Sequence, residues 1–299
     1  MSTSLNSPLR AIQHIRPMGC RSDAHLMLCT DNSLYVVRFQ TSVQEPKLIS
    51  AFVGSRLARI LGLPVPEAVT VEVSDFLINN TPELSHLKRS SSNRGTSLHP
   101  GAYYAGEADR KHLWDMLPDV YLRSLRNKDD FPRLLTLDKW CSHLGPPQAV
   151  FFRASRDTEY EVRFVNRSAS FCRDELCFRD YPDNGVYGQK AVYSHVTGWD
   201  SLEPVLNRLV LISPDTLWRA TRDLPFGWSV RYSSHLDSLV DTLLIRRSRV
   251  RELIAQSREC IPDLFPAWTS RTVLPPRTHW NLKPAFRPMQ VRVNASSLP

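Results

Sequence analysis

The feature that most constrains the fold is a change in hydrophobic periodicity along the chain. Three short apolar segments of the N-terminal part have the composition of β-strands: Ala24–Cys29, Leu34–Gln40 and Ala68–Val73. The turn between the first two, Thr30–Ser33, has the length and chemistry of a hairpin connection. A helix is predicted between the second and third strands, because apolar residues recur at helical spacing from Pro46 until Gly62.

After Leu113 the helical period dominates. Helices are predicted over Asp119–Arg126, Pro132–Trp140, Ser201–Leu211 and Pro214–Arg222. Gln148–Arg153 and Tyr160–Val165 read as a pair of strands. One apolar stripe from Leu236 to Ile254 predicts a single helix of about five turns. Strands with one helix, followed by helices around a small strand pair, indicate a two-lobed α+β arrangement.

A length of 299 residues suits two domains or one two-lobed domain. We predict a small N-terminal lobe over residues 1–117, a helical C-terminal lobe over 118–268 and a basic, proline-rich tail over 269–299. The tail holds five of the eight net positive charges and no acid. Its prolines exclude a long helix or a central strand, so we expect it to be extended and to pack little against the core.

The rest of the chain is too weakly charged to predict a nucleic-acid-binding surface, so nucleic acid is not an expected partner. No apolar run approaches the roughly 20 residues that span a bilayer, and residues 1–15 lack the apolar segment of a signal peptide. Six cysteines in such a chain are expected to be reduced thiols. We therefore expect a cytoplasmic protein with no membrane partner.

Several catalytic and cofactor motifs are missing from the sequence. There is no G-x-S-x-G elbow and no G-x-G, and Gly101–Gly106 has P-loop spacing but lacks the lysine that binds phosphate. Cys172 and Cys177 could ligate a metal together with Cys141 and His143. We favour two half-buried thiols, because the tight C-x2-C pairs of such sites are lacking.

One set of residues, spread along the chain, has the layout of a kinase catalytic apparatus. Arg38 is a cation on a strand that is followed by a helix, and Asp138 stands five residues before His143. Asn166 follows the strand pair at the position of a metal ligand. On spacing alone, surface charges at Arg38 and Asp138 are the alternative interpretation.

Longer segments resemble the HipA-like kinase family of bacterial proteins. The resemblance is carried by Gly19–Leu26, Leu34–Gln40, Ser55–Glu67, Leu137–Trp140, Gln148–Arg153 and Val196–Pro204. It extends from about Ala11 to Ile254 and so covers most of the chain. It implies a two-lobed protein-kinase-like fold, ATP and Mg²⁺ as cofactors, and phosphoryl transfer. It also implies that four side chains meet in one cleft between the lobes: Arg38, Asp138, His143 and Asn166.

The departures from the family concern its functional positions. Of five, only Asp138, the candidate catalytic base, is retained. The family has Lys at Arg38, which would contact the nucleotide phosphates, and Glu where alignment places Ala51. It has Asn at His143 and Asp at Asn166, the two candidate metal ligands, and Gly145-Pro146-Pro147 replaces the segment that follows His143.

Each departure removes a chemical contribution. Arg38 keeps its charge but is bulkier than lysine, and Ala51 cannot form the ion pair that positions the strand cation. Mg²⁺ prefers oxygen ligands, so an imidazole and a neutral amide weaken its site and leave the binding of ATP with Mg²⁺ in doubt. Together these changes favour a pseudokinase that acts by binding a nucleotide or a protein.

Two alternatives stay open, so the sequence alone does not decide whether the chain is an enzyme. The first is an active ATP-dependent phosphotransferase of the Ser/Thr-kinase type that uses Asp138 as its base. The second is a binder of nucleic acid or of an acidic partner through residues 269–299.

Overall fold

A computed structural model describes residues 9–18, 24–39, 45–87, 96–104, 113–153, 155, 157–172, 176–222, 224 and 226–269. The tail beyond Thr269, of which we expected an extended conformation, lies outside these residues.

The N-terminal sheet is antiparallel, with strand order β1-β2-β3-β5-β4. Its strands are β1 (Ala11–Pro17), β2 (Ala24–Cys29), β3 (Leu34–Arg38), β4 (Ala68–Ser74) and β5 (Thr96–Tyr103). The three predicted strands are confirmed, and β1 and β5 are additional. β1 is an edge strand with few buried residues, so its sequence lacks the apolar pattern of a strand. β5 contains Pro100 and Gly101, two residue types that are uncommon inside strands, and so was not predicted.

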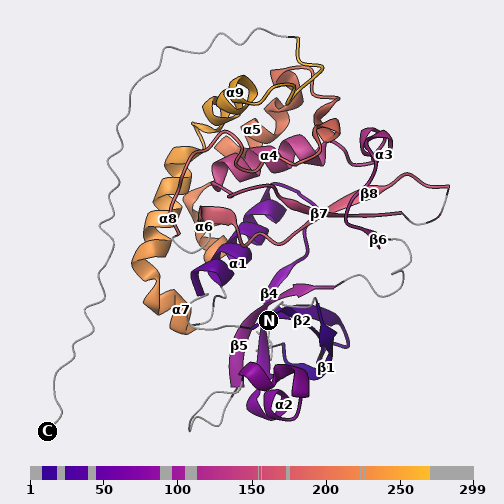
Figure 1. The fold of residues 1–299 in the computed structure, drawn as a ribbon. Coiled ribbons are helices and arrows are strands. Elements are labelled where there is room, and N and C mark those ends of the chain that lie inside the picture. Colours follow the sequence, from indigo (N-terminus) through magenta and orange to yellow (C-terminus); the bar gives the residue numbers. More distant parts are fainter. Residues whose placement is uncertain are drawn as a thin grey trace, which may run out of the picture.

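A second, three-stranded sheet belongs to the C-terminal part, with order β6-β7-β8. Its strands are β6 (Leu113–Trp114), β7 (Gln148–Phe152) and β8 (Glu161–Val165). The predicted strand pair forms β7 and β8, which are antiparallel, with Gln148 opposite Val165. Figure 1 shows this sheet well separated from the N-terminal sheet.

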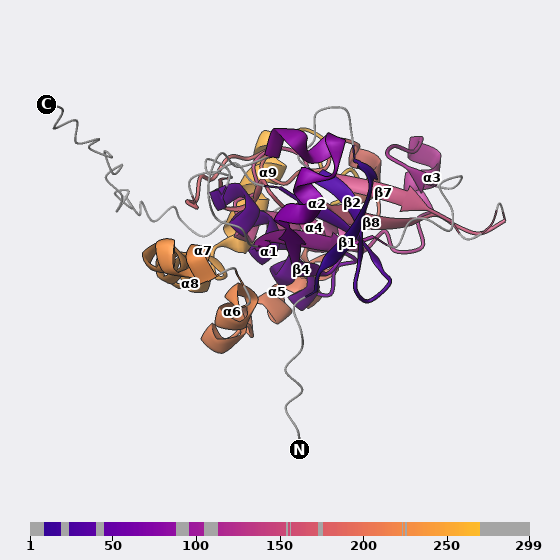
Figure 2. The ribbon, with the colours of Figure 1, turned by 90° about the horizontal axis from the view of Figure 1, so that it is seen from below.

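The helices are α1 (Glu45–Ile60), α2 (Asp75–Asn79), α3 (Asp119–Arg123), α4 (Asp130–Trp140), α5 (Glu203–Val210), α6 (Pro214–Thr221), α7 (Phe226–Arg231), α8 (Ser233–Arg246) and α9 (Val250–Cys260). Figure 2 shows α6, α7 and α8 gathered on the side of the molecule away from β7 and β8. The single helix predicted from Leu236 to Ile254 is wrong, because it is divided into α8 and α9. Leu243 and Val250 are seven residues apart, so the apolar stripe continues across the break and does not reveal it.

Buried apolar side chains form two clusters. The smaller lies on the N-terminal sheet and includes Met27, Val37 and Val71. The larger includes residues of α1, such as Phe52 and Leu57, together with those of the C-terminal helices. Helix α1 therefore packs with the C-terminal part, although it follows the N-terminal strands in sequence (Figure 1). The lobe boundary at residue 117 stays a prediction.

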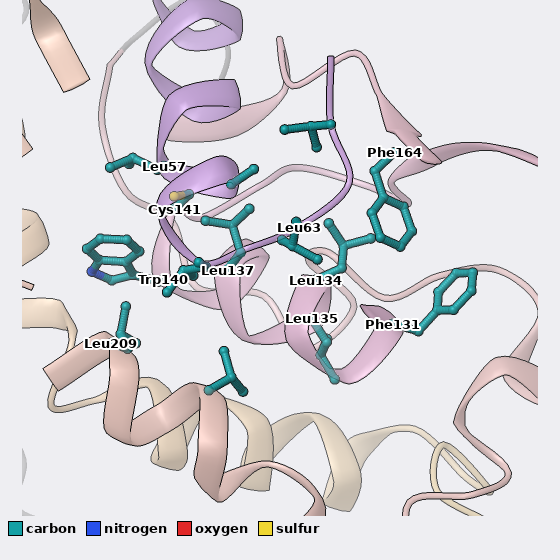
Figure 3. Close-up of a cluster of buried hydrophobic side chains, with 14 of the residues drawn as sticks. Leu57, Leu63, Phe131, Leu134, Leu135, Leu137, Trp140, Cys141, Phe164 and Leu209 are labelled. Atoms are coloured by element: carbon teal, nitrogen blue, oxygen red, sulfur yellow. The ribbon is translucent and has the colours of Figure 1, made fainter. Parts of the chain in front are cut away.

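Helix α4 lies at the centre of the larger cluster, with its leucines directed toward α1 and the neighbouring helices (Figure 3). Its C-terminal end is fixed by polar contacts to α8. The indole nitrogen of Trp140 donates to the carbonyl of Leu243 at 2.8 Å. Buried Arg246 donates to the carbonyls of Lys139 and Trp140, at 2.8 and 3.0 Å, and so satisfies acceptors that a helix end leaves open.

No described helix combines the length and the apolar composition that a membrane span requires.

We predict that Gly54→Ala destabilises the protein. A Cβ at Gly54 would lie 2.8 Å from Ser170 Oγ and 3.2 Å from the Cβ atoms of Arg167 and Ser170, so α1 or these neighbours would have to shift. Overpacking of this kind costs about 1–3 kcal/mol, measurable as a fall in the free energy of unfolding by urea denaturation. The control is Gly227→Ala in α7, where a Cβ would meet no described atom within 4 Å. Equal stability of the two variants would contradict the close packing of α1.

A second prediction concerns Lys139, which is buried and donates to the carbonyls of Tyr181 and Pro182 at 3.3 and 2.8 Å. Burial lowers the pKa of Lys139 from 10.5 to about 8, against the opposing effect of Asp183 and Asp180. Between these pKa values the unfolded chain binds more protons than the folded one, so this group makes stability rise with pH.

Relative to Lys139→Met, the wild-type protein should therefore gain about 1 kcal/mol of unfolding free energy between pH 7 and pH 9. Denaturant unfolding of both proteins at the two pH values measures the difference. A difference that stays constant with pH would show that Lys139 titrates normally.

Candidate functional site

Asp138 lies inside helix α4, two residues before its last residue, Trp140. Its side chain is 0% exposed and its carboxylate accepts from both terminal nitrogens of Arg167. The Arg167 side chain is also buried, at 1% exposure, so the two form an ion pair shielded from solvent. Removing one partner from such a pair leaves an uncompensated buried charge.

Arg167 reaches this position because it follows β8 and the turn residue Asn166. Burial lowers the pKa of the Arg167 guanidinium to about 9, so the group is still protonated at neutral pH. The positive charge therefore remains opposite the Asp138 carboxylate. Sequence reasoning missed Arg167, although its position directly after a candidate metal ligand and a strand end was a usable signal.

Two glycines pack closely against the ion pair. A Cβ at Gly54 of α1 would lie 3.2 Å from the Cβ of Arg167. A Cβ at Gly185 would collide with the Cβ of Asp138, and Gly185 has a φ of +70° that favours glycine. The amide of Gly185 also donates to the carbonyl of Gly145 at 3.2 Å. The backbone thus approaches Asp138 closely where only glycine fits.

His143 and Asn166 lie near the same point, on the loop between α4 and β7 and at the end of β8. The His143 amide donates to the carbonyl of Asp138 at 2.9 Å, and its buried ring has Nδ1 3.4 Å from the carbonyl oxygen of Gly145. The Asn166 amide nitrogen donates to Gln148 Oε1 at 3.1 Å, while its oxygen accepts from Ser168 at 2.7 Å. The structure thus brings Asp138, His143 and Asn166 into one region.

Arg38 is the last residue of β3 in the N-terminal sheet, where it is half-buried and opposite Ala24. Its convergence with the other three residues in one cleft stays a prediction. Ala51 is half-buried on α1. The buried acid of α1 is instead Glu45 in its first turn, which forms an ion pair with Arg231 of α7 at 2.5 Å.

The residues near Asp138 form a poor magnesium site. His143 would offer a nitrogen, and the Asn166 oxygen is neutral and already accepts a hydrogen bond from Ser168. Mg²⁺ prefers several oxygen ligands, at least one of them a carboxylate. Across the described ranges, no three His, Cys, Asp or Glu side chains are grouped so that they could hold a metal ion.

Cys172 and Cys177 are thiols outside any disulfide, the first buried and the second half-buried. Cys172 Sγ lies 3.7 Å from Ser142 Oγ. Its pKa is lowered to about 7, chiefly because the Cys177 side chain hydrogen-bonds to it. Cys141 lies in the core, where burial raises its pKa above the usual range.

Comparisons with known proteins identify the fold. The structure of the Golgi casein kinase is similar over 84% of this chain and 73% of that one, with 10% identity and a TM-score of 0.50. The Helicobacter pylori proinflammatory kinase CtkA is similar over 85% and 99%, with 12% identity and a TM-score of 0.49. HipA of Shewanella oneidensis MR-1, in a complex with HipB and operator DNA, is similar over 84% and 75%, with 13% identity and a TM-score of 0.43.

The first of these similarities shows a kinase-like fold, as the sequence predicted. No curated protein matches the chain. The sequence model of the HipA-like kinases matches residues 13–95, from β1 to the segment before β5. This match, over the N-terminal part of the chain, and the kinase-like α+β fold support the resemblance to the HipA-like kinase family.

Proposed function

We propose that this protein is a kinase-fold pseudokinase, which binds a nucleotide without transferring its phosphate. The observation that carries the proposal is the burial of Asp138, the one expected catalytic residue that the chain retains. A general base must come within about 3 Å of the hydroxyl proton that it removes. A carboxylate with 0% exposure, occupied by Arg167, is unavailable to a substrate hydroxyl.

The loop between α4 and β7 supports the same conclusion. In kinases the catalytic acid stands on a loop, where it faces the substrate. Here that loop runs from Cys141 to Pro147 and contains no acid. Asp138 precedes it on a helix, so its role is to hold Arg167 in the core.

The residues available to bind a metal ion also support the proposal. Phosphoryl transfer depends on metal ions that neutralise the developing charge on the phosphate oxygens. His143 and Asn166 supply neither a carboxylate nor a free oxygen pair for Mg²⁺. Arg38 keeps a positive charge on the strand where the family binds phosphate. We therefore propose that the chain still binds the phosphates of a nucleotide through this charge.

The first test of the proposal is a thermal-shift titration with ATP, with and without Mg²⁺. ATP that binds only the native state must raise the melting temperature by mass action. We expect a shift without Mg²⁺, no further gain when Mg²⁺ is added, and loss of the shift in Arg38→Gln. Arg123→Gln, an exposed arginine on α3, is the matched charge control. A shift that requires Mg²⁺ would favour the active phosphotransferase, and no shift at all would contradict nucleotide binding.

The second test is a double-mutant cycle on the ion pair. We expect Asp138→Asn and Arg167→Met each to cost about 3–5 kcal/mol of unfolding free energy, because each leaves a buried group without its partner. The double variant Asp138→Leu with Arg167→Met should lose less than the sum of the single losses, since no charge stays unpaired.

Denaturant unfolding measures the stabilities, and Asp157→Asn on the exposed segment before β8 controls for loss of an acid. If Asp138→Asn is as stable as the wild-type protein, Asp138 has no structural role and the proposal loses its main support.

A further inference from the structure

An open cavity of about 390 Å³ lies between the C-terminal half of α1, the start of β4 and helix α6. Three arginines line it, Arg56 and Arg59 from α1 and Arg219 from α6, with Glu67 as the one acid. Its lining therefore carries a net charge of 3 − 1 = +2. Apolar side chains, among them Ile60 and Ala220, complete the walls.

Two of the arginines are held in place by their surroundings. Arg219 donates to Thr216 Oγ1 at 3.1 Å and to the Asp215 carbonyl at 3.3 Å, both within its own helix. Arg56 stacks over Phe52 at 4.3 Å and donates to the Arg219 carbonyl at 3.4 Å. Arginines that are already ordered lose less side-chain entropy when they bind an anion.

The pairing of Arg59 with the acid of the cavity is weak. Arg59 and Glu67 lie 3.7 Å apart, and their side chains are 47% and 61% exposed. Exposed pairs of this kind contribute little, so an incoming anion can compete with Glu67 for Arg59.

A second open cavity, of about 320 Å³, adjoins the first because Arg59 lines both. It follows the turn Gly62–Val65 and ends at Arg133, which donates to the Gly62 carbonyl at 3.1 Å. Together the two cavities, which share Arg59, form a track from the three arginines of the first cavity past the turn Gly62–Val65. At its far side the track is lined by Asp130 and Arg133, which form an ion pair at 2.5 Å. The track is longer than a single phosphate ion requires.

We propose that this track binds a phosphorylated segment of a partner protein, with the phosphorylated side chain between Arg59 and Arg219. A phosphomonoester carries close to two negative charges at neutral pH, which matches the net +2 of the first cavity. One guanidinium group can donate two parallel hydrogen bonds to the oxygens of a phosphate. The apolar walls and the second cavity would receive the residues that flank the phosphorylated one. None of the lining residues is one that we assign to the nucleotide, so this inference does not rest on the proposed function.

The test uses fluorescence anisotropy with degenerate peptide libraries that carry phosphoserine, phosphothreonine or phosphotyrosine at a fixed central position. The full chain is the receptor, and each library is compared with its unphosphorylated counterpart. We expect at least one phosphorylated library to bind about tenfold more tightly than its counterpart, with an affinity that falls as salt increases. In the double variant Arg59→Gln with Arg219→Gln this preference should disappear.

Arg123→Gln paired with Arg126→Gln, both exposed and on another part of the chain, is the matched control and should bind as the wild type does. Equal melting temperatures would show that both double variants are folded. Equal binding of phosphorylated and unphosphorylated libraries would overturn the proposal, as would an equal loss in both double variants. Inorganic phosphate or AMP that competes as well as the peptides would also overturn it, because the site would then select a small anion.

Discussion

The buried ion pair between Asp138 and Arg167 is the interaction on which the centre of the molecule depends. It joins α4, which carries Asp138, to the turn after β8, which carries Arg167. Gly54 of α1 packs against that same turn, and Gly185 packs against Asp138. Because two buried charges are costly to desolvate, their close pairing offsets that cost only if the packing of these segments holds both side chains in place. At this position, an ion pair fixes the arrangement of these segments, where an ordinary core would have apolar side chains such as leucine.

This arrangement is the basis of our proposal that the kinase-like fold of this chain binds a nucleotide without phosphoryl transfer. Catalysis in this class of enzymes consists of positioning and charge stabilisation, so its residues stand on loops and strand ends that face a cleft. In this chain the acid has become part of the helix core, and the loop that follows carries proline and glycine instead of acids. The scaffold that remains offers cationic surfaces, among them Arg38 on β3 and the track around Arg59. Binding, without phosphoryl transfer, is therefore the activity that we propose for this scaffold.

The sequence predicted the elements whose apolar pattern is strong. The hairpin of β2 and β3, helix α1 and the pair β7 and β8 follow from alternation and helical spacing, because each buries a well-defined face. Edge strand β1 and the proline-containing β5 were not predicted, since neither shows that pattern. The division between α8 and α9 was not predicted, because Leu243 and Val250 continue the helical spacing across it.

The site could be predicted only in part, for a different reason. The positions of Asp138, His143 and Asn166 near one another follow from the order of the elements that carry them. The partner of Asp138 is 29 residues away, and no local pattern reveals a contact over that distance. Exposure is likewise a property of the packed molecule, so the burial of the Asp138 carboxylate could not be predicted from the sequence.

The most direct measurement of this account is phosphoryl transfer itself. The wild-type protein, in excess over γ-³²P-labelled ATP and supplied with Mg²⁺ or Mn²⁺, would be followed for labelled phosphate, labelled protein and ADP. The account predicts no conversion of ATP above the rate without protein, because the acid that would act as a base is bound to Arg167 in the core. Turnover by the wild-type protein that is lost in a folded Asp138→Asn variant would contradict it and would make Asp138 a catalytic base.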